Sequence, residues 1–235
     1  MHKNLFNAYK DTSLNHKIAF TGIFFALAII LQSVAKFMPF ASTFIKINLS
    51  LIFILPIFYF AGMKFGISAL ILRTISGFGI EMFIITVNPP DKEHINLFSI
   101  EAILFGHFIL LLSSASAIFF MYCFSAAFSK IKKHNYKLLL ISIFTTFTTT
   151  IFLTILNMIF LTPAYFAIIS HKSFSVSEAI KTYNYVTEFY FFIKNYWAGT
   201  FVVYFTGNLV KFSIIYIIYF PLSKILRRHA INKTY

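Results

Sequence analysis

Four ionisable side chains lie within long apolar runs of the sequence: Arg73, Glu81, Glu101 and Lys211. A charge at the centre of a lipid bilayer costs about 2.5–3.5 kcal/mol on insertion scales, so such residues are expected to face a cavity, a partner or each other. Arg73 and Glu81 are about two helical turns apart and could share one helix face. For Glu81 we favour a purely structural pairing.

Two asparagines accompany Lys211 in these apolar runs. Asn208 precedes Lys211 by three residues, so both side chains project from one helix face, and Asn157 lies six residues before Pro163. A buried carboxamide needs hydrogen-bond partners, and it offers both donors and an acceptor to the edge of a flat heterocycle. The three side chains either satisfy one another within the bundle or line a polar pocket, and the sequence leaves both alternatives open.

A third group of polar residues stands in the segment P-F-A-S-T-F-I-K-I-N-L-S at 39–50. Apolar and polar residues alternate here, unlike in a plain turn. Phe44 and Ile45 could cap a pocket, while Lys46 and Asn48 could supply polar contacts to a ligand. The alternative is an ordinary interfacial connector with a lysine that reaches toward water.

Motifs of soluble enzymes do not occur in the chain. The patterns G-x-x-x-x-G-K-[ST], H-E-x-x-H and G-x-S-x-G are all absent. His107 is the one histidine inside an apolar run, and we interpret it as a hydrogen-bonded packing residue rather than a ligand. We therefore expect no catalytic residue, no metal and no resident cofactor.

The elements that position these residues are expected to lie in a membrane. The chain has 235 residues, of which 59% are hydrophobic and 11% charged, whereas a soluble domain carries about 25% charged residues. A helix that crosses a bilayer needs roughly 20 apolar residues. We predict an all-α integral membrane protein, a six-helix bundle with spans at 18–38, 47–63, 66–87, 97–128, 137–166 and 196–222.

The charges alternate from one loop to the next. Twelve cations and one acid, Asp11, occupy both tails, the turn after the second span and the loop after the fourth, whereas the other three loops hold six lysines and four acids. By the positive-inside rule, both termini are cytoplasmic, with tails at 1–17 and 227–235 around a membrane domain at 18–226. This distribution explains the net charge of +13 without a nucleic-acid partner.

One predicted outer loop, residues 167–195, is long and rich in Tyr, Ser and Lys. Ser175 is followed three residues later by Glu178, a capping-box pattern that predicts a short helix beginning near Ser175. Two interpretations of the loop remain open. It is either a solvated connector or a lid over a site that opens to the outside.

The chain resembles the substrate-binding subunits of energy-coupling-factor transporters, and specifically the riboflavin-binding type. The similar stretches are F-I-K-I-N-L-S at 44–50, G-M-K-F-G at 62–66 followed by Arg73, L-N-M-I-F-L-T-P-A-Y at 156–165, and N-L-V-K at 208–211. Glu101 and Gly106 add a weaker similarity. The resemblance covers roughly residues 18–226, and it implies a six-helix bundle that holds a vitamin near its outer face.

The resemblance also implies which residues bind the vitamin. Asn157, Asn208 and Lys211 are expected to contact the flavin ring or its ribityl chain, and Lys211 can only donate hydrogen bonds. The remaining substrate-binding residues implied are Phe44, Ile45, Lys46, Asn48, Glu101 and Tyr165. Asn48 stands where riboflavin-binding members usually have Asp, and Met63 replaces their usual Pro.

The resemblance further implies partner subunits. Gly22-x-x-x-Ala26 is similar to the small-residue motif by which the first helix docks on a transmembrane scaffold, itself driven by two ATPases. The expected role is a non-catalytic, high-affinity vitamin-binding subunit in the cell membrane, with riboflavin as the transported ligand. Phosphorylated flavins are less favoured, because no cluster of cations faces the proposed pocket.

Three alternatives belong to other classes of protein or ligand. The same kind of subunit could bind another vitamin, such as folate. A membrane-embedded enzyme acting on lipids is disfavoured, because Glu81 and Glu101 lie on different spans and form no carboxylate cluster. A stand-alone secondary transporter is usually larger and built from repeats, and the sequence shows no internal repeat.

Overall fold

The computed structural model describes residues 13–34, 48–87 and 99–231, with side chains described up to Arg227. Within these ranges the chain is helical and contains no strand. The long helices are α1 (Leu14–Val34), α3 (Met63–Val87), α4 (Ile100–Ala127), α5 (His134–Leu156) and α8 (Tyr196–Ile231). The shorter elements are α2 (Leu51–Phe60), the π-helix η5 (Asn157–Leu161), α6 (Thr162–Ser170), α7 (Val176–Tyr183) and the 3-10 helix η6 (Thr187–Tyr190).

The helices form the apolar bundle that the composition predicts. Five segments of the described chain are long and apolar enough to cross a membrane: 14–34, 63–87, 100–127, 134–170 and 196–227. Large apolar side chains cover their outward sides, as at Ile75, Phe83 and Ile217, which are 60%, 69% and 70% exposed. Contiguous apolar surface of this kind needs lipid or a protein partner to cover it. The all-α, multi-span prediction is confirmed in this coarse form.

The second predicted span, 47–63, is shorter in the structure. α2 has ten residues, about 15 Å of helix, which is half of a hydrocarbon core of about 30 Å. The chain enters it through a turn in which Asn48 Oδ1 accepts the Ser50 N–H at 2.9 Å, and leaves it at Gly62, whose φ of 98° allows the reversal into α3. The hydropathy of the sequence detects the whole apolar run but does not detect these two turns.

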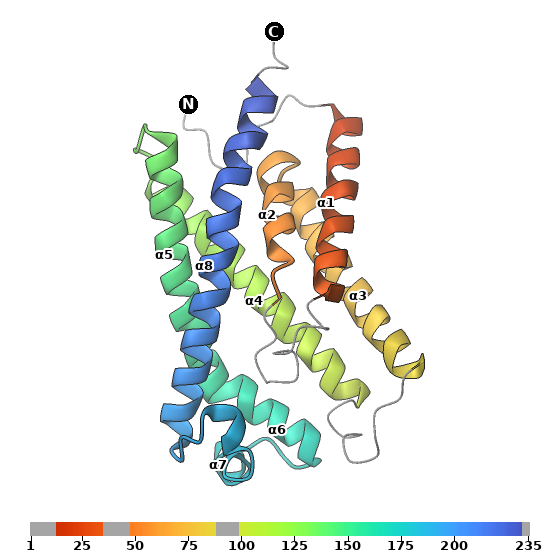
Figure 1. The fold of residues 1–235 in the computed structure, drawn as a ribbon, viewed down its shortest axis with the longest axis vertical. Helices are drawn as coiled ribbons and strands as arrows, with labels where there is room; N and C mark the ends of the chain where they lie inside the picture. The colour runs from red at the N-terminus through yellow and green to blue at the C-terminus, as the bar shows by residue number, and fades with distance from the viewer. Residues whose placement is uncertain (1–12, 35–47, 88–98, 232–235) are drawn as a thin grey trace.

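α2 occupies the centre of the bundle. It contacts α1, α3 and α8, and nearly all of its side chains are buried (Figure 1). A helix that is apolar all round is stable only when it is surrounded in this way. Its first residue therefore lies inside the molecule, close to where α4 crosses.

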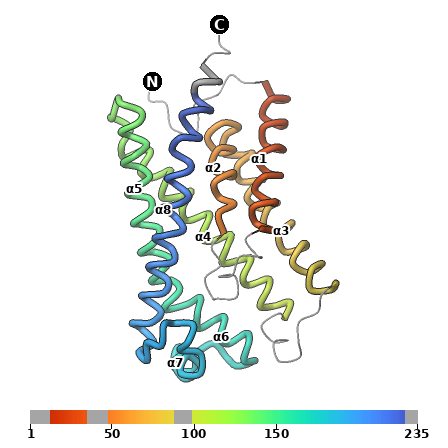
Figure 2. Tube along the Cα trace, viewed as in Figure 1, coloured from red at the N-terminus to blue at the C-terminus, as the bar shows by residue number. Residues whose placement is uncertain are grey.

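The fifth predicted span, 137–166, changes direction before its end. α5 passes through η5 into α6, and α6 diverges from the axis of α5 (Figures 1 and 2). Pro163 follows directly; it lacks an N–H and crowds the carbonyl of the preceding turn, and π-helical turns are a common cause of such bends. The bend brings α6 against α4.

The two ends of the bundle differ in charge. α1 begins and α8 ends at one end, where the α2–α3 and α4–α5 turns also lie (Figure 1). This end, which we call the basic end, carries the described cations Lys17, Lys64, Lys130, Lys132, Lys133, Lys137, Lys224 and Arg227. α6 and α7 lie at the opposite end.

Residues 167–195 form a folded cap at that opposite end. Ser175 caps α7 by accepting the Glu178 N–H at 3.4 Å, which confirms the predicted start of the helix. Tyr183 is fully buried and its hydroxyl donates to Ile193 O at 2.6 Å. Tyr190 is equally buried, with its hydroxyl 3.5 Å from that of Tyr204 on α8. The cap is thus packed against α8.

Candidate functional site

Two buried cations meet on adjacent residues of α4. Arg73 of α3 is fully buried, and its Nη1 donates to Ser50 Oγ at 3.0 Å and its Nη2 to Ser114 Oγ at 2.9 Å. Lys211 of α8 is 7% exposed, and its Nζ donates to Ser113 Oγ at 2.6 Å. Their serine partners, Ser114 and Ser113, are adjacent in sequence on α4. We call these two cations and three serines the cationic centre.

The cationic centre has no carboxylate. No ion pair in the described part of the chain involves Arg73 or Lys211. Serine hydroxyls are neutral acceptors, and Arg73 Nε is buried without any hydrogen-bond partner among the described residues. A buried charge that lacks a compensating partner is strongly unfavourable. The sequence did not predict that Arg73 and Lys211 would reach adjacent serines of α4.

A second polar layer lies two turns further along α3. Glu81 Oε2 and His107 Nε2 are 2.9 Å apart, and both side chains are buried. Gln32 of α1 is buried beside them, since a Cβ placed on Gly77 would meet both its amide and the His107 ring. We call Glu81, His107 and Gln32 the paired layer, after the Glu81–His107 contact; the Gln32 amide and His107 Nδ1 are buried without a hydrogen-bond partner among the described residues. The packing role predicted for His107 is confirmed, and Glu81 pairs with α4 instead of Arg73.

The three residues predicted to converge on a ligand lie on adjoining elements. Asn157 is buried in η5, and its Nδ2 donates to Leu153 O at 2.6 Å. Asn208 is half-buried on α8, one turn before Lys211. η5 and α8 are in contact. No hydrogen bond joins the three side chains within the described structure, and the group that Lys211 does meet, Arg73 with its serines, was not part of the prediction.

The other predicted binding residues fall into three groups. Asn48 is buried and orders the entry to α2 next to Ser50. Glu101 is exposed in the first turn of α4. Tyr165 is half-buried on α6 and lies within electrostatic range of Glu81. Phe44, Ile45 and Lys46 lie outside the described residues.

The predicted docking stripe is open. Gly22 and Ala26 are both exposed on α1, and a Cβ built on Gly22 would meet no atom within 4 Å. Ile23 and Leu27 beside them are also exposed, at 62% and 37%. The described chain leaves this face of α1 uncovered.

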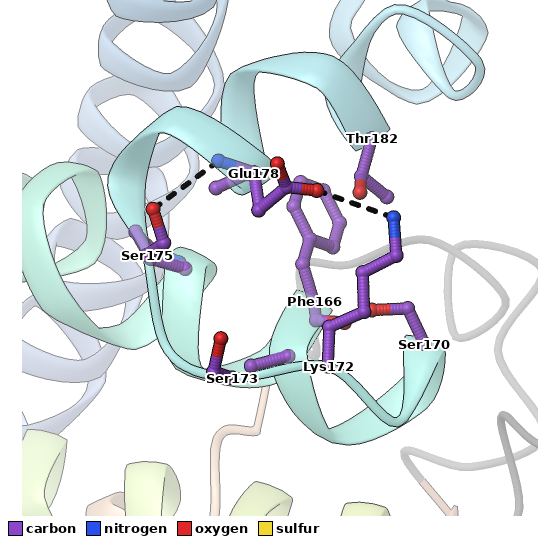
Figure 3. A pocket seen from close by; sticks show the side chains of 10 residues that line it. Phe166, Ser170, Lys172, Ser173, Ser175, Glu178 and Thr182 are labelled. Atoms are coloured by element: carbon purple, nitrogen blue, oxygen red, sulfur yellow. Dashed lines mark hydrogen bonds and ion pairs between the residues drawn. The ribbon is translucent and has the colours of Figure 1, made fainter.

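Two hollows occur at the end opposite the basic end. One lies between α6 and α7 and is too narrow to hold a water molecule (Figure 3). The other, about 240 Å³, is lined by Glu101, Ala167, Ile168 and His171. Both are below the roughly 300–1,000 Å³ of typical ligand pockets. Neither is lined by Asn157, Asn208 or Lys211.

The first hollow belongs to the packing of the cap. Figure 3 shows Glu178 on α7 facing Lys172, with Ser175 at the start of the helix. Glu178 bonds Lys181 at 2.6 Å and Lys172 at 3.2 Å, and these hydrogen bonds hold the pKa of its carboxyl below the ordinary value. The charges of this hollow are already neutralised, which disfavours it as a ligand site.

Sequence reasoning missed Ser50, Ser113 and Ser114. A short hydroxyl in an apolar helix commonly bonds the carbonyl four residues earlier, as Ser114 does with Leu110 O at 2.9 Å, so serines are easily taken as neutral filler. The usable signal was two adjacent serines at the midpoint of a 28-residue apolar helix.

No protein-family model matches the chain, and no solved structure matches it. The chain is similar to the "Uncharacterized protein MG350.1 homolog" of Mycoplasma pneumoniae, with 33% identity over 89 residues. That match covers 35% of this chain and 39% of the relative, so the chain spans less than half of the relative's length in it. The similarity marks a shared segment and brings no function with it.

Proposed function

We propose that this chain is the high-affinity vitamin-binding subunit of an energy-coupling-factor type importer, with riboflavin as its cargo. The observation that carries the proposal is the environment of Lys211, a buried ammonium group whose one hydrogen-bond partner among the described residues is the neutral Ser113 hydroxyl. Such a group has donors to spare. Flavin carbonyls, ring nitrogens and ribityl oxygens are suitable acceptors, and an ionisable residue inside a membrane bundle is a functional candidate by default.

The arrangement of helices supports six passages of the chain through the bundle. α1, α3, α4, α5 with α6, and α8 are the long passages, and in this proposal the shorter α2 belongs to the sixth. Because the basic end holds eight of the described cations and no described acid, the positive-inside rule assigns that end to the cytoplasm. Both the start of α1 and the end of α8 then face the cytoplasm, in the cell membrane.

The opposite end is then the side from which the vitamin arrives. Tyr165, Glu101 and Asn157 lie on elements of that half, and the cap formed by α7 and η6 covers part of it. We propose that Phe44, Ile45 and Lys46 join this side of the site.

The proposed transport needs partners, because binding alone does not move the ligand. The exposed Gly22 and Ala26 allow close approach of a partner helix, which suits docking of α1 on a transmembrane scaffold driven by two ATPases. In this proposal the chain itself performs no chemical step and holds no resident cofactor.

The test is to purify the full chain in detergent and record its visible absorption spectrum. A flavin band in the purified protein, or saturable quenching of added riboflavin fluorescence, is the expected result. A folded, colourless protein that leaves the fluorescence of added riboflavin unchanged would contradict the proposal.

A further inference from the structure

We infer that the cationic centre is a binding site for an oxyanion, a phosphate or carboxylate group carried by the ligand. The inference rests on the proposed function in one respect, namely that a vitamin enters the bundle. The site itself rests on the contacts of Arg73 and Lys211.

The donors at this centre are only partly used. Arg73 is held by Ser50 and Ser114 through its two terminal nitrogens, which leaves the buried Nε–H without a partner. Lys211 has three N–H donors, of which one reaches Ser113, and its other close contact is the Phe212 ring at 4.7 Å. An oxyanion has the several lone pairs that these remaining donors require.

The charge balance requires a negative group from outside the described chain. Of the four described acids, Glu81 is paired with His107 and Glu178 with two lysines, while Glu101 and Glu188 are exposed. Two neighbouring cations in apolar surroundings repel each other and lose their hydration. A bound anion offsets both the repulsion and the lost hydration, whereas a neutral ligand offsets only part of the lost hydration.

The N-terminus of α2 adds positive potential at the same place. α2 begins inside the bundle at Leu51, and Ser50, the residue just before it, accepts a hydrogen bond from Arg73. A helix N-terminus carries a partial positive charge and favours anions. Helices that start within the membrane point this end at substrate carboxylates in some transporters. Here it coincides with a guanidinium that has an unused donor.

The charge of the cationic centre predicts an order of affinity among the possible ligands. Riboflavin is uncharged at neutral pH, so it satisfies the hydrogen-bond donors but leaves the charge uncompensated. Riboflavin 5′-phosphate supplies both the flavin and the oxyanion, and folate supplies carboxylates. We therefore expect the phosphate ester to bind at least tenfold more tightly than riboflavin.

The experiment measures thermal unfolding and affinity of the full chain in detergent. The probes are riboflavin, riboflavin 5′-phosphate, folate and sodium phosphate, with sodium chloride at equal ionic strength as the reference. The variants are Arg73→Gln and Lys211→Met, and Lys64→Gln, exposed at the start of α3, is the matched control. We expect the oxyanion probes to raise the Tm of wild type and Lys64→Gln. Removing one charged hydrogen bond should weaken binding about 10- to 100-fold in Arg73→Gln.

The outcomes separate the oxyanion site from the flavin proposal. Equal binding of riboflavin and its phosphate, unaffected by Arg73→Gln, would overturn the oxyanion site and leave riboflavin capture standing. Stabilisation by folate or sodium phosphate that is lost in Arg73→Gln, with neither flavin bound, would support the site and reject the flavin cargo. No response of wild type to any oxyanion would overturn the inference.

If Arg73→Gln does not fold, Arg73→Lys takes its place. Unchanged affinity for the phosphate probes in both Arg73→Lys and Lys211→Met would also count against the site.

Discussion

The cationic centre and the paired layer are two solutions to the same problem. Both place buried ionisable groups between α3 and α4, about two turns apart along α3. In the paired layer, Glu81 of one helix meets His107 of the other at 2.9 Å. In the cationic centre, Arg73 and Lys211 meet only serines and each other's charge. The Glu81–His107 contact can be explained by the stability that it gives to the fold. Two buried cations destabilise the fold, so the presence of both Arg73 and Lys211 needs another explanation.

We interpret the paired layer as structural and the cationic centre as the proposed ligand site. α3 and α4 contribute to both sites, so the same pair of helices satisfies its charges at one level and leaves them uncompensated at the other. Replacing residues at the two levels should therefore have opposite effects on the ligand-free protein. We expect three effects on stability at these two levels and a smaller one at the surface.

The largest effect is expected for His107→Phe in the paired layer. It removes the partner of a buried carboxylate, so the free energy of unfolding should fall by about 3 kcal/mol. Denaturant unfolding of the purified protein in bicelles measures this change. Leu104→Phe, at a position 56% exposed on the same helix, is the control and should leave the value unchanged. Equal stability of His107→Phe and wild type would remove the contrast between the two sites.

Gly77→Ala should disturb the same layer less. The added Cβ would collide with the amide end of Gln32 and lie 3.0 Å from the His107 ring, so the Gln32 side chain has to shift. We expect a loss of about 1–2 kcal/mol, typical of overpacking. Gly79→Ala on the same helix meets no atom within 4 Å and should be neutral or stabilising by up to about 1 kcal/mol. The same unfolding assay compares the two, and the opposite order would contradict the assigned packing.

Lys211→Met should have the opposite sign in the ligand-free protein. It removes a buried cation that faces another cation, and exchanging buried charge for an apolar side chain of similar volume is often neutral or stabilising. We expect the free energy of unfolding to stay constant or rise by about 1 kcal/mol. A loss of about 3 kcal/mol, as for His107→Phe, would show that Lys211 is a structural residue.

The smallest effect is expected at the surface, where Glu178 is paired with Lys181 and Lys172. Since its pKa in the folded state lies below the ordinary 4.5, the pairing stabilises α7 above that pH and is lost as pH falls through the lowered value. Hydrogen exchange of residues 172–183, corrected for the intrinsic rate, should quicken slightly on acidification. Glu178→Gln should abolish this pH dependence, and an unchanged dependence in that variant would assign it to another group.

Much of the bundle follows from the sequence, and the failures have physical causes. Apolar runs located the five long helices, and Ser175 with Glu178 marked the start of α7, because these signals are local. The length of α2 depends on the turns at Asn48 and Gly62, which hydropathy does not register. The bend at η5 was not predicted either, although Pro163 stands beside it.

The site was less predictable than the fold. Lys211 and Arg73 were singled out because charges in apolar helices are costly, and both are indeed buried. Their meeting through Ser113 and Ser114 depends on how α3, α4 and α8 cross, which no single segment encodes. Asn157 was expected to converge with Asn208 and Lys211 on a ligand, and in the structure its amide donates to Leu153 O.

The most direct test of the account is the affinity of the purified protein for riboflavin, followed by flavin fluorescence, in wild type, Lys211→Ala and Asn208→Ala. The account predicts saturable binding by wild type and a loss of about 1.5–3 kcal/mol, roughly 10- to 100-fold, on removing the hydrogen bond of Lys211, with weaker binding in Asn208→Ala as well. Unchanged affinity in both variants, or no binding by folded wild-type protein, would contradict it.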